Sequence, residues 1–184
     1  MKFTLLCLAA VGMTSMASAV SITYTTMATA SGSLNGTSYS NALITLTGLG
    51  DTDNLVNLGG YKYVPITTTV SVAGLGSDTL TDPTILFHVT NFGVGFESAP
   101  FLPDILDTSA SALYNYDLVS SIGPTVGDSL YNEEASFATV GGSFIMDNAG
   151  NSTFSASINA VPEPASMAAL SLGGLALLRR RRKA

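Results

Sequence analysis

The stretch PITTTVSVAG, residues 65–74, alternates between two kinds of side chain with a period of two. One kind is mainly apolar and comprises Ile66, Thr68, Val70 and Val72. The residues between them are all Thr or Ser. Side chains i and i+2 share one face of a β-strand, whereas a helix would mix the two kinds. The pattern therefore predicts a strand with one buried and one exposed face.

Strand-like stretches recur along the chain and are separated by Gly-rich segments such as TGLGDTDN and NFGVGF. They cover residues 21–29, 42–47, 84–90, 114–119 and 136–140. Residues 142–158 predict a hairpin whose turn is the polar segment Asp-Asn-Ala-Gly-Asn at 147–151. One short helix of one or two turns is expected within residues 103–114. Together these features predict an all-β domain, an antiparallel β-sandwich of jelly-roll-like type.

The first nineteen residues have the composition of a signal peptide. Lys2 precedes an apolar run, and Ala17 and Ala19 supply the small side chains that signal peptidase requires at the third-last and last positions. We therefore expect signal peptidase to cut before Val20 and the rest of the chain to be exported. An uncleaved anchor fits less well, because the apolar run is about half as long as a membrane span.

Residues 20–160, which we expect to form the folded domain, are strongly acidic. They contain twelve carboxylates and a single basic side chain, Lys62, which gives a net charge of −11. Nucleic-acid binding is excluded, because phosphate contacts need Lys and Arg. The only cysteine, Cys7, lies in the signal peptide, so the exported chain would have no disulfide and no thiol for catalysis or metal binding.

The C-terminal segment 161–184, VPEPASMAALSLGGLALLRRRRKA, differs from the domain before it. Pro162 and Pro164 flank Glu163 and keep this stretch extended and accessible. Residues 165–178 predict a transmembrane helix of roughly 21 Å, shorter than the bilayer core of about 30 Å. The basic tail at residues 179–183 then stays in the cytoplasm by the positive-inside rule.

This order of features resembles the PEP-CTERM sorting signal of Gram-negative, exopolysaccharide-producing bacteria. The resemblance implies processing by an exosortase, a membrane enzyme of the cysteine transpeptidase kind, which recognises Pro162, Glu163 and Pro164. It also implies that the precursor is retained in the membrane by Arg179, Arg180, Arg181 and Arg182. The domain would then reach the cell surface or the extracellular space. The residues alone also leave open a plain single-span anchor that no enzyme cleaves.

The domain offers few residues for catalysis, and we expect it not to be an enzyme. The domain has a single histidine, His88, and no Gly-x-Ser-x-Gly elbow that would supply a nucleophilic serine for it. One His without Cys also excludes a Cys–His pair and a multi-histidine zinc site. We expect His88 to be an ordinary strand residue. Two pairs of acids, Asp104 with Asp107 and Glu133 with Glu134, are the candidates for carboxylate-dependent hydrolysis.

The segment DTDN at residues 51–54 begins like a calcium-binding loop. However, Val56 and Lys62 stand where such a loop requires Gly and Glu. We therefore expect an acidic turn here, and neither a metal nor a cofactor in the chain.

The functional expectation is a non-catalytic, exosortase-processed protein of the cell surface or extracellular matrix, associated with biofilm or exopolysaccharide. The first alternative is a carbohydrate- or surface-binding module, which an exposed patch of several tyrosines would favour. The candidates for that patch are Tyr24, Tyr61, Tyr63, Tyr114 and Tyr116. An ice-binding variant would need a regular Thr array, of which residues 66–70 offer a single run. A hydrolase would need two acids with raised pKa values in one cleft.

Overall fold

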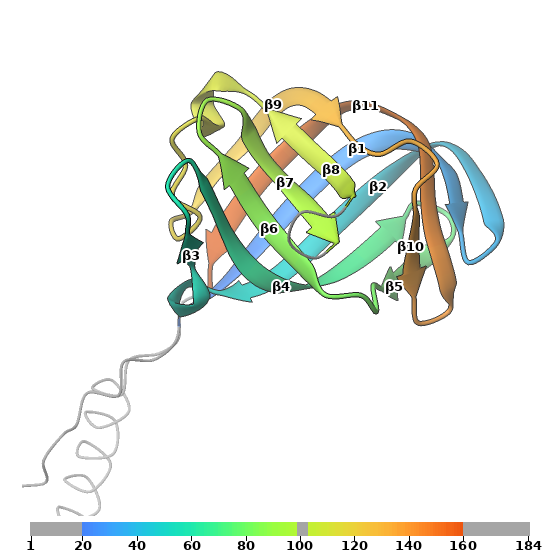
Figure 1. The fold of residues 1–184 in the computed structure, drawn as a ribbon. Helices are drawn as coiled ribbons and strands as arrows, with labels where there is room; N and C mark the ends of the chain where they lie inside the picture. The colour runs from blue at the N-terminus through green and yellow to red at the C-terminus, as the bar shows by residue number, and fades with distance from the viewer. Residues whose placement is uncertain (1–19, 99–102, 160–184) are drawn as a thin grey trace, which may run out of the picture. The chain divides into compact units, whose positions relative to one another are not determined.

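The computed structural model describes residues 20–98 and 103–159, and this part of the chain consists mainly of strands (Figure 1). In chain order the elements are β1 (Ser21–Leu34), β2 (Thr37–Asp51), η1 (Thr52–Asn54), β3 (Val56–Asn57), β4 (Tyr61–Val72), β5 (Gly76–Thr79), β6 (Thr84–Val89), β7 (Gly93–Ser98), β8 (Asp104–Ser109), η2 (Ser111–Leu113), β9 (Ile122–Leu130), β10 (Ser136–Thr139) and β11 (Gly142–Ile158). The prediction of an all-β domain is confirmed.

The strands pair into one antiparallel sheet that closes on itself. Neighbouring strands follow the order β1-β2-β4-β6-β7-β8-β9-β11, and β11 pairs with β1, so these eight strands form a closed barrel. The short strands β3 and β5 add to β4, and β10 adds to β11. The expected sandwich of two separate sheets is therefore replaced by one closed sheet. Closure removes the open edges that a sandwich of the same strands would expose.

β11 runs without interruption through the segment predicted as a hairpin turn, so that prediction is wrong. Ser152 pairs with Ala28 and Ala149 with Ala30, which leaves one more residue on β11 than on β1 between these pairs. This is a β-bulge, which locally bends the strand. The polar, Gly-containing sequence at 147–151 forms a bulge and not a turn, because β1 pairs with β11 both before and after this segment.

The helix expected within residues 103–114 is also largely wrong. Half of this segment forms β8, which pairs with β7 and β9. Only η2 has helical hydrogen bonding, as a single 3-10 turn with Leu113 buried beneath it.

Residues 114–119, predicted as a strand, form turns. The Asp117 carboxylate accepts hydrogen bonds from the backbone N–H groups of Val119 at 2.9 Å and Ser120 at 3.0 Å. Leu118 adopts a φ of 66°, in the left-handed region. The Asp side chain therefore offers the backbone a local alternative to strand pairing.

Alternate residues of each strand point into the barrel and fill it. The buried face predicted from residues 65–74 is confirmed, since Ile66, Thr68, Val70 and Val72 are all buried. Phe96 and Phe154 are fully enclosed. Tyr24 is also enclosed, and its hydroxyl donates to the Leu118 carbonyl at 2.5 Å, which satisfies its polar end.

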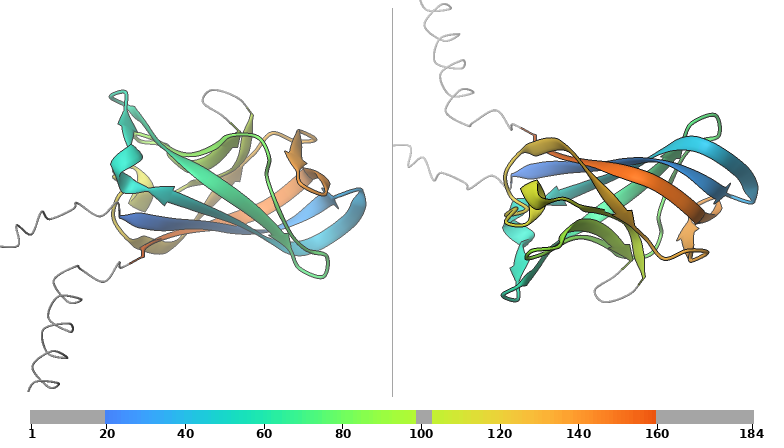
Figure 2. Two further views of the ribbon diagram at one scale, coloured as in Figure 1. Left: turned by 90° about the horizontal axis from the view of Figure 1, so that it is seen from below. Right: turned by 90° about the horizontal axis from the view of Figure 1, so that it is seen from above.

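The two ends of the described chain are joined to each other. The backbone N–H of Asn159 donates to the Ser21 carbonyl at 2.8 Å. The Asn159 side-chain amide donates to Ser21 Oγ at 3.1 Å and to Thr23 Oγ1 at 3.0 Å. Both views of Figure 2 show β1 and β11 side by side, and the barrel is therefore closed by the last residues described.

Several predictions concern residues outside the described chain. These are the signal peptide with Ala17 and Ala19, the motif Pro162, Glu163 and Pro164, the helix at 165–178 and the basic tail. Within residues 20–98 and 103–159, no helix combines the length and apolar character needed to cross a bilayer.

The inward-facing Gly48 of β2 makes room for the core, and it supplies a first prediction. A Cβ at this position would lie 2.6 Å from Ile66 Cδ1 and 2.9 Å from Phe96 Cε1. We expect Gly48→Ala to lower the free energy of unfolding by about 1–3 kcal/mol, because an overpacked core must shift. Gly60→Ala is the matched control, since a Cβ there has no neighbour within 4 Å. Denaturant unfolding compares them, and equal stabilities would contradict this account of the core.

Candidate functional site

A gap in strand pairing lies on one side of the barrel, where β2 and β4 part. The pairing of β2 with β4 ends at Gly50 and Ile66. β3 then pairs with the same strand at Val56 and Tyr63. Because β6 occupies the other edge of β4 over this region, β3 and β2 share one edge, and η1 connects them. The edge of β4 between these two partners is left uncovered.

The turn η1 that spans the gap is the acidic turn predicted from the sequence. Asp51 is its N-cap and accepts the backbone N–H of Asp53 at 2.9 Å. Such a cap satisfies a backbone donor that the short turn leaves without a partner. Within the described chain, no group of three His, Cys, Asp or Glu residues is placed to hold a metal ion.

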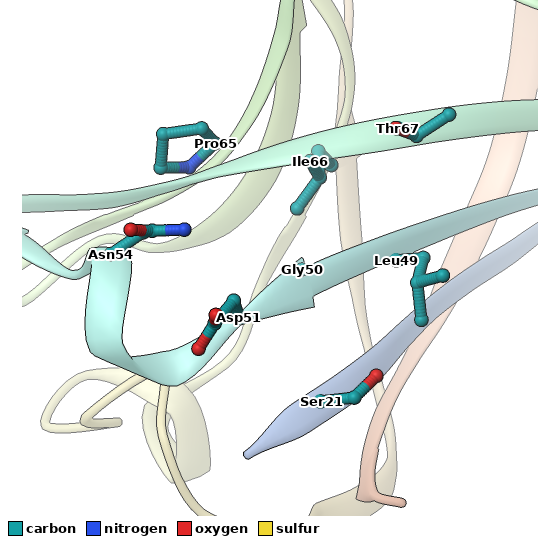
Figure 3. Close-up of a pocket in the computed structure, with 8 residues that line it drawn as sticks. All are labelled: Ser21, Leu49, Gly50, Asp51, Asn54, Pro65, Ile66 and Thr67. Atoms are coloured by element: carbon teal, nitrogen blue, oxygen red, sulfur yellow. The ribbon is translucent and has the colours of Figure 1, made fainter. Parts of the chain in front are cut away.

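An open depression of about 410 Å³ lies at this gap (Figure 3). It is lined by Ser21 of β1, Leu49, Gly50 and Asp51 of β2, Asn54 of η1, and Pro65, Ile66 and Thr67 of β4. Leu49, which is 54% exposed, contributes apolar surface together with Pro65 and Ile66. An apolar lining with a few polar groups at its rim is the composition of small-molecule sites.

The polar groups of the depression are mostly available to a ligand. Asp51 uses one carboxylate oxygen for its cap, and Ser21 Oγ accepts from Asn159. The Asn54 amide and the Thr67 hydroxyl make no hydrogen bond to the described residues, so donors and acceptors remain on both sides of the apolar lining.

Two of the five candidate tyrosines come together beside this depression. Tyr61 and Tyr63 are half-buried on the outward face of β4, with ring centroids 6.0 Å apart. Phe87 of β6 stacks on Tyr61 at 5.8 Å. The Tyr61 hydroxyl donates to Glu97 Oε2 at 2.9 Å, and burial is the main cause that raises the pKa of Tyr61.

The other three tyrosines do not join this patch. Tyr24 and Tyr116 are buried in the core, and burial raises the pKa of both hydroxyls. Tyr114 lies in the turn that follows η2. Of the five tyrosines whose exposure in one patch would favour a carbohydrate-binding module, only Tyr61 and Tyr63 come together, and both are half-buried.

The strand register aligns hydroxyl side chains in rows across the outside of the barrel. One row consists of Ser155, Thr25, Thr47, Thr69 and Thr79, on β11, β1, β2, β4 and β5. The adjacent rows are Thr153, Met27, Thr45, Ser71 and Ser77 on one side, and Ser157, Thr23, Leu49 and Thr67 on the other. We call these fourteen residues the hydroxyl face. The sequence showed one run of threonines, and the other strands join it only once the register is known.

Of the two acid pairs proposed for hydrolysis, Asp104 and Asp107 are partly enclosed. Asp107 is 1% exposed, and its Oδ1 has no hydrogen-bond partner. Burial, with smaller contributions from Asp104 and Glu97, raises the pKa of Asp107 well above its usual range. Burial also raises the pKa of Asp104. The sequence did not single out Glu97, which the pairing of β7 with β8 places opposite Asp104.

Among the described residues, the Asp107 carboxyl is enclosed rather than open to solvent. The Asp107 carboxyl covers Gly95, where any Cβ would collide with its Oδ1. A hydrolytic pair must reach one substrate with both carboxyl groups, and Asp107 is enclosed. The second pair, Glu133 and Glu134, lies exposed in the turn between β9 and β10.

His88 is a packed residue inside the barrel, beneath η2. Its Nε2 lies 3.1 Å from the carbonyl oxygens of both Leu113 and Tyr114, so Nε2 carries the proton and donates. Its Nδ1 is buried without a partner. Burial lowers the pKa of His88, which favours the neutral ring. The ring therefore tethers η2 to the barrel.

Comparison with known proteins assigns the C-terminal segment to a known sorting motif. Residues 160–183 match the PEP-CTERM protein-sorting motif. The chain carries this sorting motif. The PEP-CTERM motif indicates an exported protein, anchored through its C-terminus, that an exosortase recognises. No curated protein and no solved structure matches the chain. The barrel that precedes the PEP-CTERM motif is therefore interpreted from its own geometry.

The buried Asp107 generates a second prediction, on stability and pH. Folding raises the pKa of Asp107, so its ionisation destabilises the folded state as the pH rises above the usual carboxyl range. We expect Asp107→Asn to be more stable than the wild type at about pH 7 and of similar stability near pH 3, where the carboxyl is protonated in both states.

Urea unfolding at several pH values measures this difference. Asp128→Asn on the exposed part of β9 is the control and should show little change between these pH values. A lower stability of Asp107→Asn at neutral pH would contradict the account of an enclosed, unfavourable charge.

Proposed function

We propose that this chain is an exported protein that an exosortase processes at its PEP-CTERM motif, and that its barrel then serves as a non-catalytic component of the cell surface or extracellular matrix. We associate that matrix with biofilm or exopolysaccharide. The observation that carries the proposal is the position of the motif. The motif begins at residue 160, and the residue before it, Asn159, is hydrogen-bonded to Ser21 at the start of the barrel.

Both expected cleavages fall outside the barrel. Signal peptidase would cut before Val20, whereas β1 begins at Ser21. An exosortase would cut near the Pro-Glu-Pro triplet, whereas β11 ends at Ile158. Removal of both terminal segments therefore leaves every described strand pair in place, and the processed product can keep the fold of the precursor.

The absence of catalysis is supported by the chemistry of the described residues. Asp107 is enclosed, and the donor nitrogen of His88 is occupied by two carbonyl groups. The high net negative charge suits a solvated protein outside the cell. These features favour a structural or binding role.

A third prediction tests sorting in the native cell. We expect intact-mass measurement in the wild type to find a chain that begins at Val20 and lacks the basic residues 179–183. In a strain without the exosortase, the basic tail should be retained and the protein should stay in the membrane fraction.

Replacement of Glu163 by Ala, with the exosortase present, tests the motif itself and should reproduce the unprocessed mass. Asp128→Ala in the barrel is the matched control and should be processed normally. An unchanged C-terminus in the wild type and in the strain without the exosortase would overturn the proposed sorting and indicate a permanent anchor.

A further inference from the structure

The outward face of β4 connects the tyrosine patch, the depression and the hydroxyl face. Along this strand Tyr63, Pro65, Thr67, Thr69 and Ser71 follow one another on the same side, at intervals of about 7 Å. Tyr63 lies beside the depression, Pro65 and Thr67 line it, and Thr69 and Ser71 belong to the rows beyond it. These parts form one continuous surface.

The depression offers the mixture of groups that recognises a polyhydroxylated ring. Leu49, Pro65 and Ile66 present apolar surface to its C–H groups. The Asn54 amide both donates and accepts, the Thr67 hydroxyl does the same, and the second oxygen of Asp51 accepts. Its volume of about 410 Å³ falls within the range of about 300–1,000 Å³ that is usual for small-molecule sites.

Charge and composition argue against two other ligand classes, anions and metal ions. The domain has a net charge of −11, and its single base, Lys62, does not line the depression. Anionic ligands would therefore meet repulsion without a compensating cation. A metal ion would find one carboxylate only, that of Asp51, among the lining residues. A neutral, hydroxyl-rich ligand is matched by the apolar lining together with the Asn54 amide and the Thr67 hydroxyl.

The hydroxyl face indicates that this ligand extends beyond the depression. Its fourteen residues include no charged side chain, and two of them, Leu49 and Thr67, also line the depression. Apart from Thr23, which bonds to Asn159, none of its hydroxyls makes a hydrogen bond to the described residues. A regular set of unoccupied donors and acceptors matches a polymer that repeats its own hydroxyl groups.

We propose that the depression holds part of a neutral polysaccharide and that the adjoining hydroxyl face binds the chain as it continues across β4, β2 and β1. Tyr63 lies on β4 beyond Pro65, on the side of the depression away from the hydroxyl face, and provides an aromatic surface there. This inference rests on the proposed function, because it requires the barrel to meet polysaccharide outside the cytoplasm.

Affinity electrophoresis of the full chain in mild detergent tests the inference. Native gels contain dextran, galactomannan or hydroxyethylcellulose as neutral probes, and alginate as an anionic one. We expect at least one neutral probe to retard the wild type and alginate not to do so. The double variant Asn54→Ala, Thr67→Val removes two of the three available polar groups of the depression and should weaken the retardation at least tenfold.

Thr37→Val is the matched control, because Thr37 is exposed on the same strand as Leu49 but roughly 40 Å along it. It should bind like the wild type. Thr47→Val, in the middle row of the hydroxyl face, should weaken binding to the polymer more than binding to a disaccharide of the same sugar. Thermal unfolding confirms that each variant is folded, which is expected because the replaced side chains are not in the core.

Three results would overturn the inference. These are no retardation by any neutral probe, equal retardation of the double variant and the wild type, and stronger retardation by alginate. Changes in ice-crystal growth without polysaccharide binding would assign the hydroxyl face to ordered water instead. None of these results depends on exosortase processing, so a failure here is distinguishable from a failure of the sorting experiment.

Discussion

β1 is paired along both of its edges, and the rest of the barrel depends on this double pairing. It pairs with β2 from Ser21 to Leu34 and with β11 from Ile22 to Leu34. The pairing with β11 joins the two ends of the domain, since Ile22 pairs with Ile158. Such non-local pairs form late in folding because a long loop must close first. The barrel can therefore close only after the last strand has been made.

Closure by the last strand also explains how the domain and the PEP-CTERM motif can be separate in one chain. Asn159 completes the ladder and the motif follows at residue 160, so no strand needs any part of the motif. An enzyme that acts on the motif acts on a segment that the barrel does not require. The same holds at the other end, where the first paired residue comes directly after the expected signal-peptidase site.

The sequence was sufficient for several features that depend on neighbours along the chain. It predicted the buried face of residues 65–74, the acidic turn at 51–54, the strand position of His88 and the sorting motif. Each of these is specified by a few adjacent side chains. The predicted turn at 147–151 failed because a long partner strand outweighed local turn chemistry, and the predicted strand at 114–119 failed because the Asp117 carboxylate captured two backbone donors.

What the sequence could not provide was the register between distant strands. Register decides whether two sheets stack or one sheet closes, and no local pattern reports it. It also decides which side chains meet: Thr25, Thr47 and Thr69 are far apart in the chain yet form one row. The depression also depends on strand pairing. One edge of β4 pairs first with β2 and then with β3, and η1 connects these two strands across the unpaired stretch between them.

The distribution of charge over the barrel decides which of its surfaces are neutral. Within the described residues, several carboxylates are satisfied by N–H groups in turns rather than by a cation. Asp78 accepts from the Asn35 side chain at 2.7 Å and from the Gly141 backbone at 2.8 Å, and these hydrogen bonds hold its pKa below the usual range. Asp78 itself belongs to the short strand β5, and the groups that donate to it lie in the turns that follow β1 and β10. The rows of the hydroxyl face contain no charged side chain. An acidic protein can in this way present a large neutral surface, and that surface lies where a hydroxyl-rich polymer can be bound without repulsion.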